Sequence, residues 1–531
     1  MLYSQDRQSG KKSGYSLITP FLLVTLLVLT GCNRWGESKE RVITMEAFSE
    51  MKTPAFVFDL DDIRSNINYL VRVDSSSTEA DRQTRNYYKA DDSKLVWIST
   101  SGIDERADSL LAWLHLVGEI GFTEYSFGVA DIEDDLQRMR NLDFGEGRQS
   151  LTHVAARLEY RLTKACLRYT YGQRYGFTNP YHILNSLDAD KKDTLGNALS
   201  YRRLFDVKMD LPSKHYANTI LNKVRKDSLA EYLRKIQLTD KMYLKLKSML
   251  PQANTNEQHR RIMVNMERCR WRRHQPIADH GKRIIVNIPA YHLYAYSPDT
   301  TIDMRVVCGT LRTKTPQLSS NIEWMEVNPQ WIIPMSIVES DITRHVGDSA
   351  YFASHRYGIY ERATNKLMNI RAVTRQMLLS GKYRVAQQGG AGNSLGRIIF
   401  RFKNNFSVFL HDTSNPGAFS RESRAVSHGC VRVSKPFELA RFVLDTPDDW
   451  LLDRIRISMG LPPMTERGQE YIDSHDEGDR NLIGYVPVKP RVPIYIIYQT
   501  LWPDADGVLQ TWPDVYGYDE VVWKHLKPYM M

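Results

Sequence analysis

The spacing of apolar residues changes character near residue 282 of this 531-residue chain. Between about residues 87 and 271 apolar side chains recur at every third or fourth position, as on one face of an amphipathic helix. After residue 282 they alternate with polar ones, or form brief runs bounded by Pro, Asp and Gly, which is typical of β-strands. The pattern predicts an α+β multidomain protein, mostly helical first and β-rich afterwards.

The composition supports several folded units. With 42% hydrophobic and 25% charged residues the chain is ordinary for a globular protein, which excludes a disordered chain, a collagen and a disulfide-rich miniprotein. The predicted segments are a leader at residues 1–32, a helical domain at 46–281, a β-rich domain at 282–458 and a C-terminal extension at 459–531 with one further strand. Aromatic residues in this extension favour docking of the tail onto the preceding domain.

The N-terminus has the pattern of an export signal. Lys11 and Lys12 precede an apolar run at residues 17–31, which is shorter than the roughly 20 residues of a transmembrane helix. The run ends in the sequence LTGC at Cys32, which resembles a bacterial lipobox and implies lipidation of the Cys32 thiol. The alternative is a plain signal peptide with a chance cysteine. We expect a periplasmic lipoprotein, and Asn33 in place of Asp favours the outer membrane over the inner one.

The remaining cysteines are too few for a disulfide framework and have the wrong spacing for zinc. They are Cys166, Cys269, Cys308 and Cys430, and no two form a C-x-x-C pair. The first three lie in apolar or helical contexts and are expected to be small buried hydrophobes. No metal is expected, because no cluster of His, Asp and Glu has the spacing of metal ligands, and no cofactor is expected either. The net charge of +9 fits an acidic polymer as partner without identifying it.

Cys430 stands in a different setting, the sequence SHGCVR at residues 427–432. A thiol attacks only as thiolate, so it needs a neighbouring base or cation. His428 is adjacent in the chain, whereas His411 lies 19 residues upstream, far enough for a loop to fold back and bring its imidazole to the thiol. Gly429 allows a tight turn whose N–H groups could hold an oxyanion. These residues could perform acyl transfer, although a structural cysteine is the alternative reading of the spacing alone.

Several stretches, in the same order along the chain, resemble the L,D-transpeptidases with a YkuD-type catalytic domain, in their larger YcbB-like subgroup. The active-site signature is matched by VFLHDT and SHGCVRV, and the strands and loops around it by further segments at residues 286–290, 305–309, 313–316, 328–334 and 390–397. The helical half also resembles the scaffold region of that subgroup, above all at residues 162–169.

The resemblance implies a peptidoglycan L,D-transpeptidase. Cys430 would form a thioester with the donor tetrapeptide stem, and an amine of a second stem would resolve it into a cross-link. His411 would be the base, and His428 and Gly429 would complete the catalytic group. The residues expected to bind substrate are Ser427, Arg432, Gly392 and Asn393. Carbapenem-type inhibitors are expected to acylate Cys430, and nucleic acid is not expected as a partner.

The resemblance leaves two functions open besides transpeptidation. Water could resolve the thioester, which gives an L,D-carboxypeptidase that trims tetrapeptide stems, or the cleft could serve a non-catalytic wall-binding lipoprotein. Residues 335–388 are predicted to form an insertion that is either a lid over the site or an ordinary structural element. The subgroup usually carries a peptidoglycan-binding module before its last scaffold helix. Residues 241–258 are too short for one, so the role of the helical domain stays open.

Overall fold

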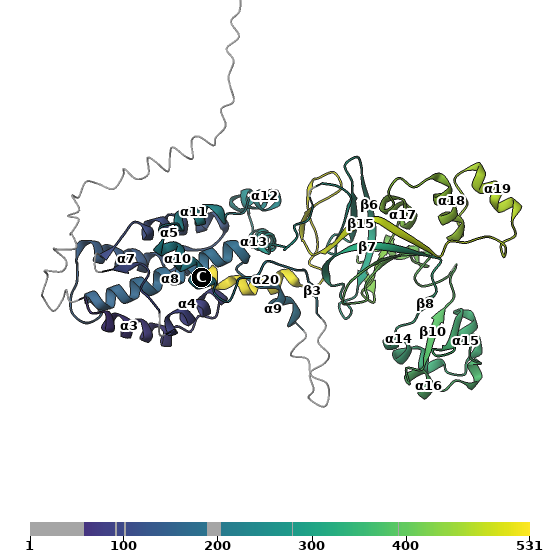
Figure 1. Cartoon of the computed structure of the whole chain (residues 1–531), viewed down its shortest axis with the longest axis horizontal. Helices are drawn as coiled ribbons and strands as arrows, with labels where there is room; N and C mark the ends of the chain where they lie inside the picture. Colours follow the sequence, from purple (N-terminus) through teal and green to yellow (C-terminus); the bar gives the residue numbers. More distant parts are fainter. Residues whose placement is uncertain are drawn as a thin grey trace, which may run out of the picture.

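A computed structural model describes residues 58–90, 93–99, 102–187, 203–278, 280–390 and 392–530. The predicted leader and Cys32 lie outside these residues. Within them, every helix is too short or too polar to cross a bilayer. The structure has the predicted order, a helical region followed by a β-rich region (Figure 1).

The helical domain is built around one long buried helix, α8 (Leu151–Tyr175), against which α3, α4 and α7 pack. Glu159 lies at its centre and is fully buried. Its carboxylate accepts hydrogen bonds from the backbone N–H groups of Val96 at 2.7 Å and Trp97 at 2.9 Å, which attach an irregular segment to the helix. The other elements are α3 (Leu60–Val73), α4 (Glu79–Lys89), β1 (Ile98–Ser99), β2 (Gly102–Ile103), α5 (Arg106–Leu114), α6 (Glu124–Phe127), α7 (Val129–Asn141), α9 (Pro180–Asn185), β3 (Phe205–Asp206), α10 (Tyr216–Arg225), α11 (Leu229–Lys235), α12 (Lys241–Met249) and α13 (Asn256–Arg270).

The β-rich domain is a large sheet that closes on itself. Its strand order is β11-β12-β14-β6-β5-β4-β15-β7-β3, and a further pairing of β11 with β7 joins the two sides. Apolar side chains of alternate strand positions form the core, together with those of α17 (Pro436–Val443). The strands are β4 (Arg283–Asn287), β5 (His292–Tyr296), β6 (Thr301–Gly309), β7 (Gln317–Val327), β11 (Ile398–Phe402), β12 (Leu410–His411), β13 (Ala425–Ser427), β14 (Val431–Val433) and β15 (Tyr485–Ile497).

The predicted boundary between a catalytic domain ending at residue 458 and a separate extension needs correction. Strand β15 lies inside the sheet, parallel to β4 and antiparallel to β7, with Ile494 opposite Ile284. The last residues of β15 are apolar and buried on both faces, which is typical of a strand with a hydrogen-bonded strand on each side. The chain therefore returns to the sheet after α18 (Asp449–Ser458) and α19 (Glu466–Ser474). Two short strands, β16 (Leu501–Pro503) and β17 (Leu509–Thr511), follow the one that was predicted.

The insertion at residues 335–388 forms a lobe with its own core. A small sheet of order β8-β10-β9 packs with short helices around Val338, Phe352 and Val385. In Figure 1 the lobe lies at the end of the molecule remote from the helical domain. Its elements are β8 (Trp331–Ile332), α14 (Met335–Ser340), α15 (Ser349–Ser354), β9 (Tyr357–Glu361), α16 (Arg375–Leu379) and β10 (Tyr383–Gln387).

The C-terminal tail is docked, as expected from its aromatic residues, but it reaches beyond the preceding β-rich domain to the helical domain. Helix α20 (Tyr518–Leu526) runs back along the molecule towards the helical domain (Figure 1). The ring of Tyr529 packs against Phe177 at 4.8 Å and Phe122 at 5.6 Å between centroids, and its carbonyl accepts a hydrogen bond from Thr123 N–H at 3.1 Å. The tail therefore connects the two domains.

Candidate active site

Two adjacent parallel strands bring the predicted catalytic residues together. β12 pairs with β14, with Leu410 opposite Val431 and His411 opposite Arg432, and Cys430 immediately precedes β14. Leu410 and Val431 point into the apolar core. Successive side chains of a strand alternate between the two faces of the sheet, so His411 and Arg432 lie on the face away from this core. Cys430 lies next to this face, at the start of β14.

His411 is 4% exposed, and its Nδ1 has no hydrogen-bond partner of standard geometry among the described residues. Burial, with a smaller effect of the nearby Arg432 cation, lowers the pKa of His411 to about 4. The backbone of Asp412 and Leu395 counteracts this in part. The imidazole is therefore neutral near pH 7, the form that accepts a proton. The Phe409 ring lies beside it at a steep angle, 5.5 Å away between centroids.

The Cys430 thiol is partly exposed and lies close to a fixed cation. Its Sγ donates a long hydrogen bond of 3.8 Å to the carbonyl of Ser407, a residue that sequence reasoning missed. Burial lowers the pKa of Arg432, while the interaction with Cys430 raises it. The guanidinium stays charged, so in this structure Arg432 rather than a protonated His411 supplies positive charge near the thiol.

The side chain of Ser427 stabilises the turn before Cys430. Ser427 is buried, and its Oγ donates to the carbonyl of Cys430 at 2.6 Å and accepts from Gly429 N–H at 3.1 Å. The backbone of Gly429 has a φ of +119°, which favours glycine. The Gly429 N–H is engaged by Ser427 in this structure, and the role predicted for the N–H groups of this turn in holding an oxyanion stays a prediction. Ser427 shapes the turn with both of its hydrogen bonds, whereas His428 is exposed beside it.

A second loop, at residues 309–315, makes hydrogen bonds to the backbone of this turn. The Thr315 hydroxyl donates to the carbonyl of Gly429 at 2.9 Å and accepts from Gly309 N–H at 2.9 Å, and the Thr313 hydroxyl donates to the carbonyl of Ser427 at 2.9 Å. Neither threonine was singled out as a site residue. The signal available in the sequence was the threonine-rich segment that follows Gly309.

The loop that follows the lobe of residues 335–388 is anchored beside His411. Asp412 accepts from Arg397 N–H at 2.9 Å, and Gly396 lies so close to Asp412 that a Cβ would collide with it. Asn393 is fully buried, and its amide donates to the carbonyls of Pro329 at 3.2 Å and Gln388 at 2.9 Å. This side chain builds the loop, whereas Gly392 is exposed. Contact of either residue with a substrate stays a prediction.

The other described cysteines are set apart from Cys430 by their surroundings. Cys166 and Cys308 are buried, and burial raises the pKa of Cys308 to about 12 and that of Cys166 further. Burial also raises the pKa of the thiol of Cys269, which is packed against the core. Over the residues that the structure covers, His, Cys, Asp and Glu nowhere gather in a group that could hold a metal ion.

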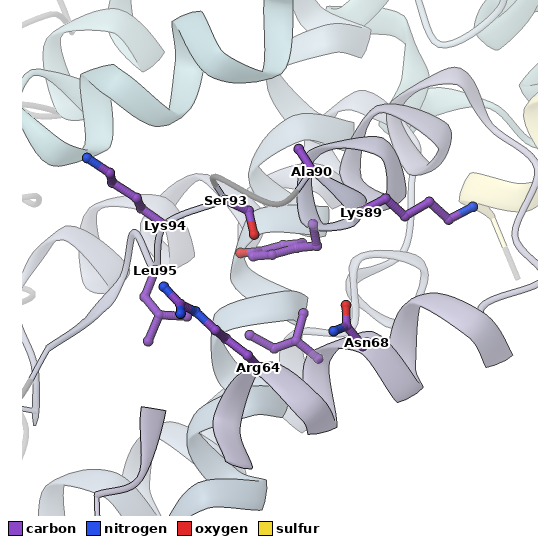
Figure 2. Close-up of a pocket in the computed structure, with 9 residues that line it drawn as sticks. Arg64, Asn68, Lys89, Ala90, Ser93, Lys94 and Leu95 are labelled. Atoms are coloured by element: carbon purple, nitrogen blue, oxygen red, sulfur yellow. The ribbon is translucent and has the colours of Figure 1, made fainter. Parts of the chain in front are cut away.

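A cavity of about 180 Å³ lies in the helical domain, between α3 and α4. Figure 2 shows the side chains of Arg64, Asn68 and Ser93 around it, with the amines of Lys89 and Lys94 directed to opposite sides. The cavity belongs to the helical domain and is separate from the Cys430 site.

A neutral buried imidazole, a partly exposed thiol and a nearby guanidinium on adjacent parallel strands are the elements of a cysteine acyl-transfer site. Comparison with known families agrees with this class. Residues 281–481 match the YkuD family, described as the L,D-transpeptidase catalytic domain, and residues 82–250 match the family described as the Scaffold domain. The chain therefore belongs to the L,D-transpeptidases of the YkuD type, with the scaffold-bearing architecture of the YcbB-like group.

The chain is also similar to a Haemophilus influenzae protein named "Putative L,D-transpeptidase". The two are 26% identical over 331 residues, which is 60% of this chain and 62% of the relative. The match thus spans less than two thirds of the relative's length. The matched residues of the YkuD family include His411, Cys430 and Arg432, whereas β15 and the tail lie beyond them.

Proposed function

We propose that this protein is a peptidoglycan L,D-transpeptidase that forms cross-links between peptide stems through a thioester on Cys430. The observation that carries the proposal is the parallel register of β12 and β14, which places His411 opposite Arg432 and one strand away from Cys430. The match to the L,D-transpeptidase catalytic domain supplies the substrate class.

The first half-reaction acylates the enzyme. Neutral His411 takes the proton of the Cys430 thiol while Arg432 stabilises the thiolate. The sulfur attacks the carbonyl of the third stem residue, the bond to the fourth residue breaks, and His411 returns the proton to the amine of the departing D-Ala. A thioester between Cys430 and the shortened stem remains.

The second half-reaction transfers the acyl group. The amine of a second stem attacks the thioester carbonyl, His411 takes a proton from that amine, and the sulfur leaves as the thiolate, to which the proton then returns. The lobe of residues 335–388 is joined to the loop that ends against Asp412, beside His411. A lobe in this position could limit the entry of water, which favours transfer to an amine over hydrolysis.

We also propose that the protein is exported and attached to the outer membrane through lipid on Cys32, with its folded domains in the periplasm. The support is the LTGC sequence and the following Asn33. Labelling of growing cells with radioactive palmitate should mark the wild-type protein and leave Cys32→Ala unlabelled. Equal labelling of both proteins would contradict the anchor.

The enzymatic proposal is tested with a purified tetrapeptide muropeptide and mass spectrometry. The wild type should release D-Ala and form dimers, and Cys430→Ala should do neither. Cys269→Ala is the matched control, because it removes a thiol packed against the core outside the site. Release of D-Ala without dimers would identify the carboxypeptidase instead. Release by Cys430→Ala at the wild-type rate would contradict both enzymatic functions.

A further inference from the structure

A tyrosine of the C-terminal tail reaches the back of the catalytic turn. The Tyr516 hydroxyl donates to the carbonyl of Gly309 at 2.7 Å and accepts from Thr315 N–H at 3.1 Å. The hydroxyl thus joins two residues of one loop. Because Tyr516 is buried, water does not compete for these hydrogen bonds. Tyr516 lies outside residues 281–481, the part that matches the YkuD family.

The loop that Tyr516 holds fixes the backbone at Cys430. The Thr315 hydroxyl donates to the carbonyl of Gly429 at 2.9 Å, and this carbonyl belongs to the same planar peptide as the N–H of Cys430. Fixing the carbonyl thus fixes the direction of the Cys430 N–H. The Cys430 N–H belongs to the turn whose amide groups are expected to hold the oxyanion of acylation.

Tyr516 is itself held by a buried network that extends to the last helix before the catalytic domain. Its N–H donates to the hydroxyl of Tyr498 at 2.7 Å, and the Tyr498 ring lies 5.1 Å from the guanidinium of Arg268 on α13. Arg268 also pairs with Asp519 of the tail at 2.6 Å, with both side chains buried. Asn265, one turn earlier on α13, accepts from the N–H of Thr500 at 3.0 Å. These contacts hold the tail, and with it Tyr516, in a fixed position.

We propose that Tyr516 is a positioning residue for acylation, which acts through Gly309 and Thr315 to orient the Cys430 amide. The inference rests on the proposed function and adds a contribution from the tail. It separates two properties of the site: the nucleophilicity of the thiol, which does not depend on an oxyanion donor, and the acylation rate, which does.

The test compares two reactions of Cys430 in Tyr516→Phe. Alkylation by iodoacetamide requires only the thiolate, whereas acylation by a carbapenem also develops an oxyanion. Acylation should slow by about 10-fold to 100-fold, the effect of a displacement near 1 Å, while alkylation stays near the wild-type rate. Tyr294→Phe is the control. It removes a buried hydroxyl of the same domain that has no hydrogen-bond partner in the described part of the chain, and both rates should stay unchanged.

A second pair of variants covers the case in which Tyr516→Phe does not fold. Thr315→Val removes the hydroxyl that holds Gly429, and Thr315→Ser keeps it. Acylation should fall in Thr315→Val and be restored in Thr315→Ser. Wild-type acylation in both Tyr516→Phe and Thr315→Val, or equal slowing of acylation and alkylation, would overturn this inference alone. A wild-type protein that a carbapenem does not acylate would overturn the proposed function as well.

Discussion

His411 on β12 is the direct parallel partner of Arg432 on β14, so an imidazole and a guanidinium occupy one face of the sheet beside Cys430. The cation and the burial of the ring act in the same direction on His411, and its pKa is about 4. His411 is therefore a neutral base near pH 7, and an imidazolium is not present to pair with the Cys430 sulfur. Arg432 is the permanent charge of the site.

Replacing Arg432 should raise the pKa of His411. Arg432→Gln removes a cation that disfavours the protonated ring, so the pKa should move from about 4 toward its ordinary value of 6.5, but not reach it, because burial is the larger cause. NMR titration of ¹³C-labelled histidine, with His411→Gln to assign the signal, measures the change. A lower pKa in Arg432→Gln would contradict the placement of the charge.

The lowered pKa of His411 should also make the stability of the fold depend on pH. Between pH 6.5 and about 4 the unfolded chain protonates at this histidine while the folded protein does not, so the contribution of His411 makes the fold less stable as the pH falls. The loss is at most about 1.4 kcal/mol per pH unit. His411→Gln should therefore have a thermal unfolding midpoint that falls less than the wild-type midpoint between pH 6.5 and pH 4.5. An identical fall in the two proteins would exclude a buried neutral histidine.

Gly309 should tolerate no side chain. A Cβ at this position would collide with the carbonyl of Thr313 and lie 3.0 Å from Cα of Gly429. Gly309→Ala should cost about 1–3 kcal/mol of stability and displace the catalytic turn, with a loss of carbapenem acylation. Gly118→Ala is the control, since nothing lies within 4 Å of its Cβ. Full acylation of Gly309→Ala, measured by intact mass, would show that the two loops are not in contact.

The buried ion pair between α13 and the tail should matter far more than an exposed pair nearby. Arg268 and Asp519 are 3% and 5% exposed, and Arg268→Met should cost about 3–5 kcal/mol because it leaves a buried carboxylate unpaired. Arg260 and Glu520 are 38% and 61% exposed, and Arg260→Met should cost about 0–1 kcal/mol. Thermal unfolding compares the two. Equal effects would contradict the described docking of α20.

The sequence predicted the parts of this structure that local pattern encodes. The change of periodicity near residue 282 separated the helical domain from the sheet, and the motif around Cys430 selected the thiol and His411. Tyr516 could not be found in this way. Its contact with Gly309 joins residues more than 200 positions apart and depends on the return of the tail, which no local pattern specifies.

The surroundings of Ser427 and Asn393 show what a motif leaves open. A motif reports which residues are present, and it does not report whether a polar side chain faces the cleft or the backbone behind it. Both side chains are buried and make hydrogen bonds within their own loops. Likewise β15 could be predicted as a strand from its apolar run, but its place between β4 and β7 follows from long-range pairing.

The intact-protein mass after incubation with a carbapenem tests most directly whether Cys430 is the acyl-transfer nucleophile. The strained lactam opens without a leaving group, so the wild type should gain the full mass of one inhibitor molecule, located on Cys430 by peptide mapping, and Cys430→Ala should gain nothing. Cys269→Ala should react like the wild type. An unmodified wild type, or an adduct that persists in Cys430→Ala, would contradict the claim that this thiol is the acyl-transfer nucleophile.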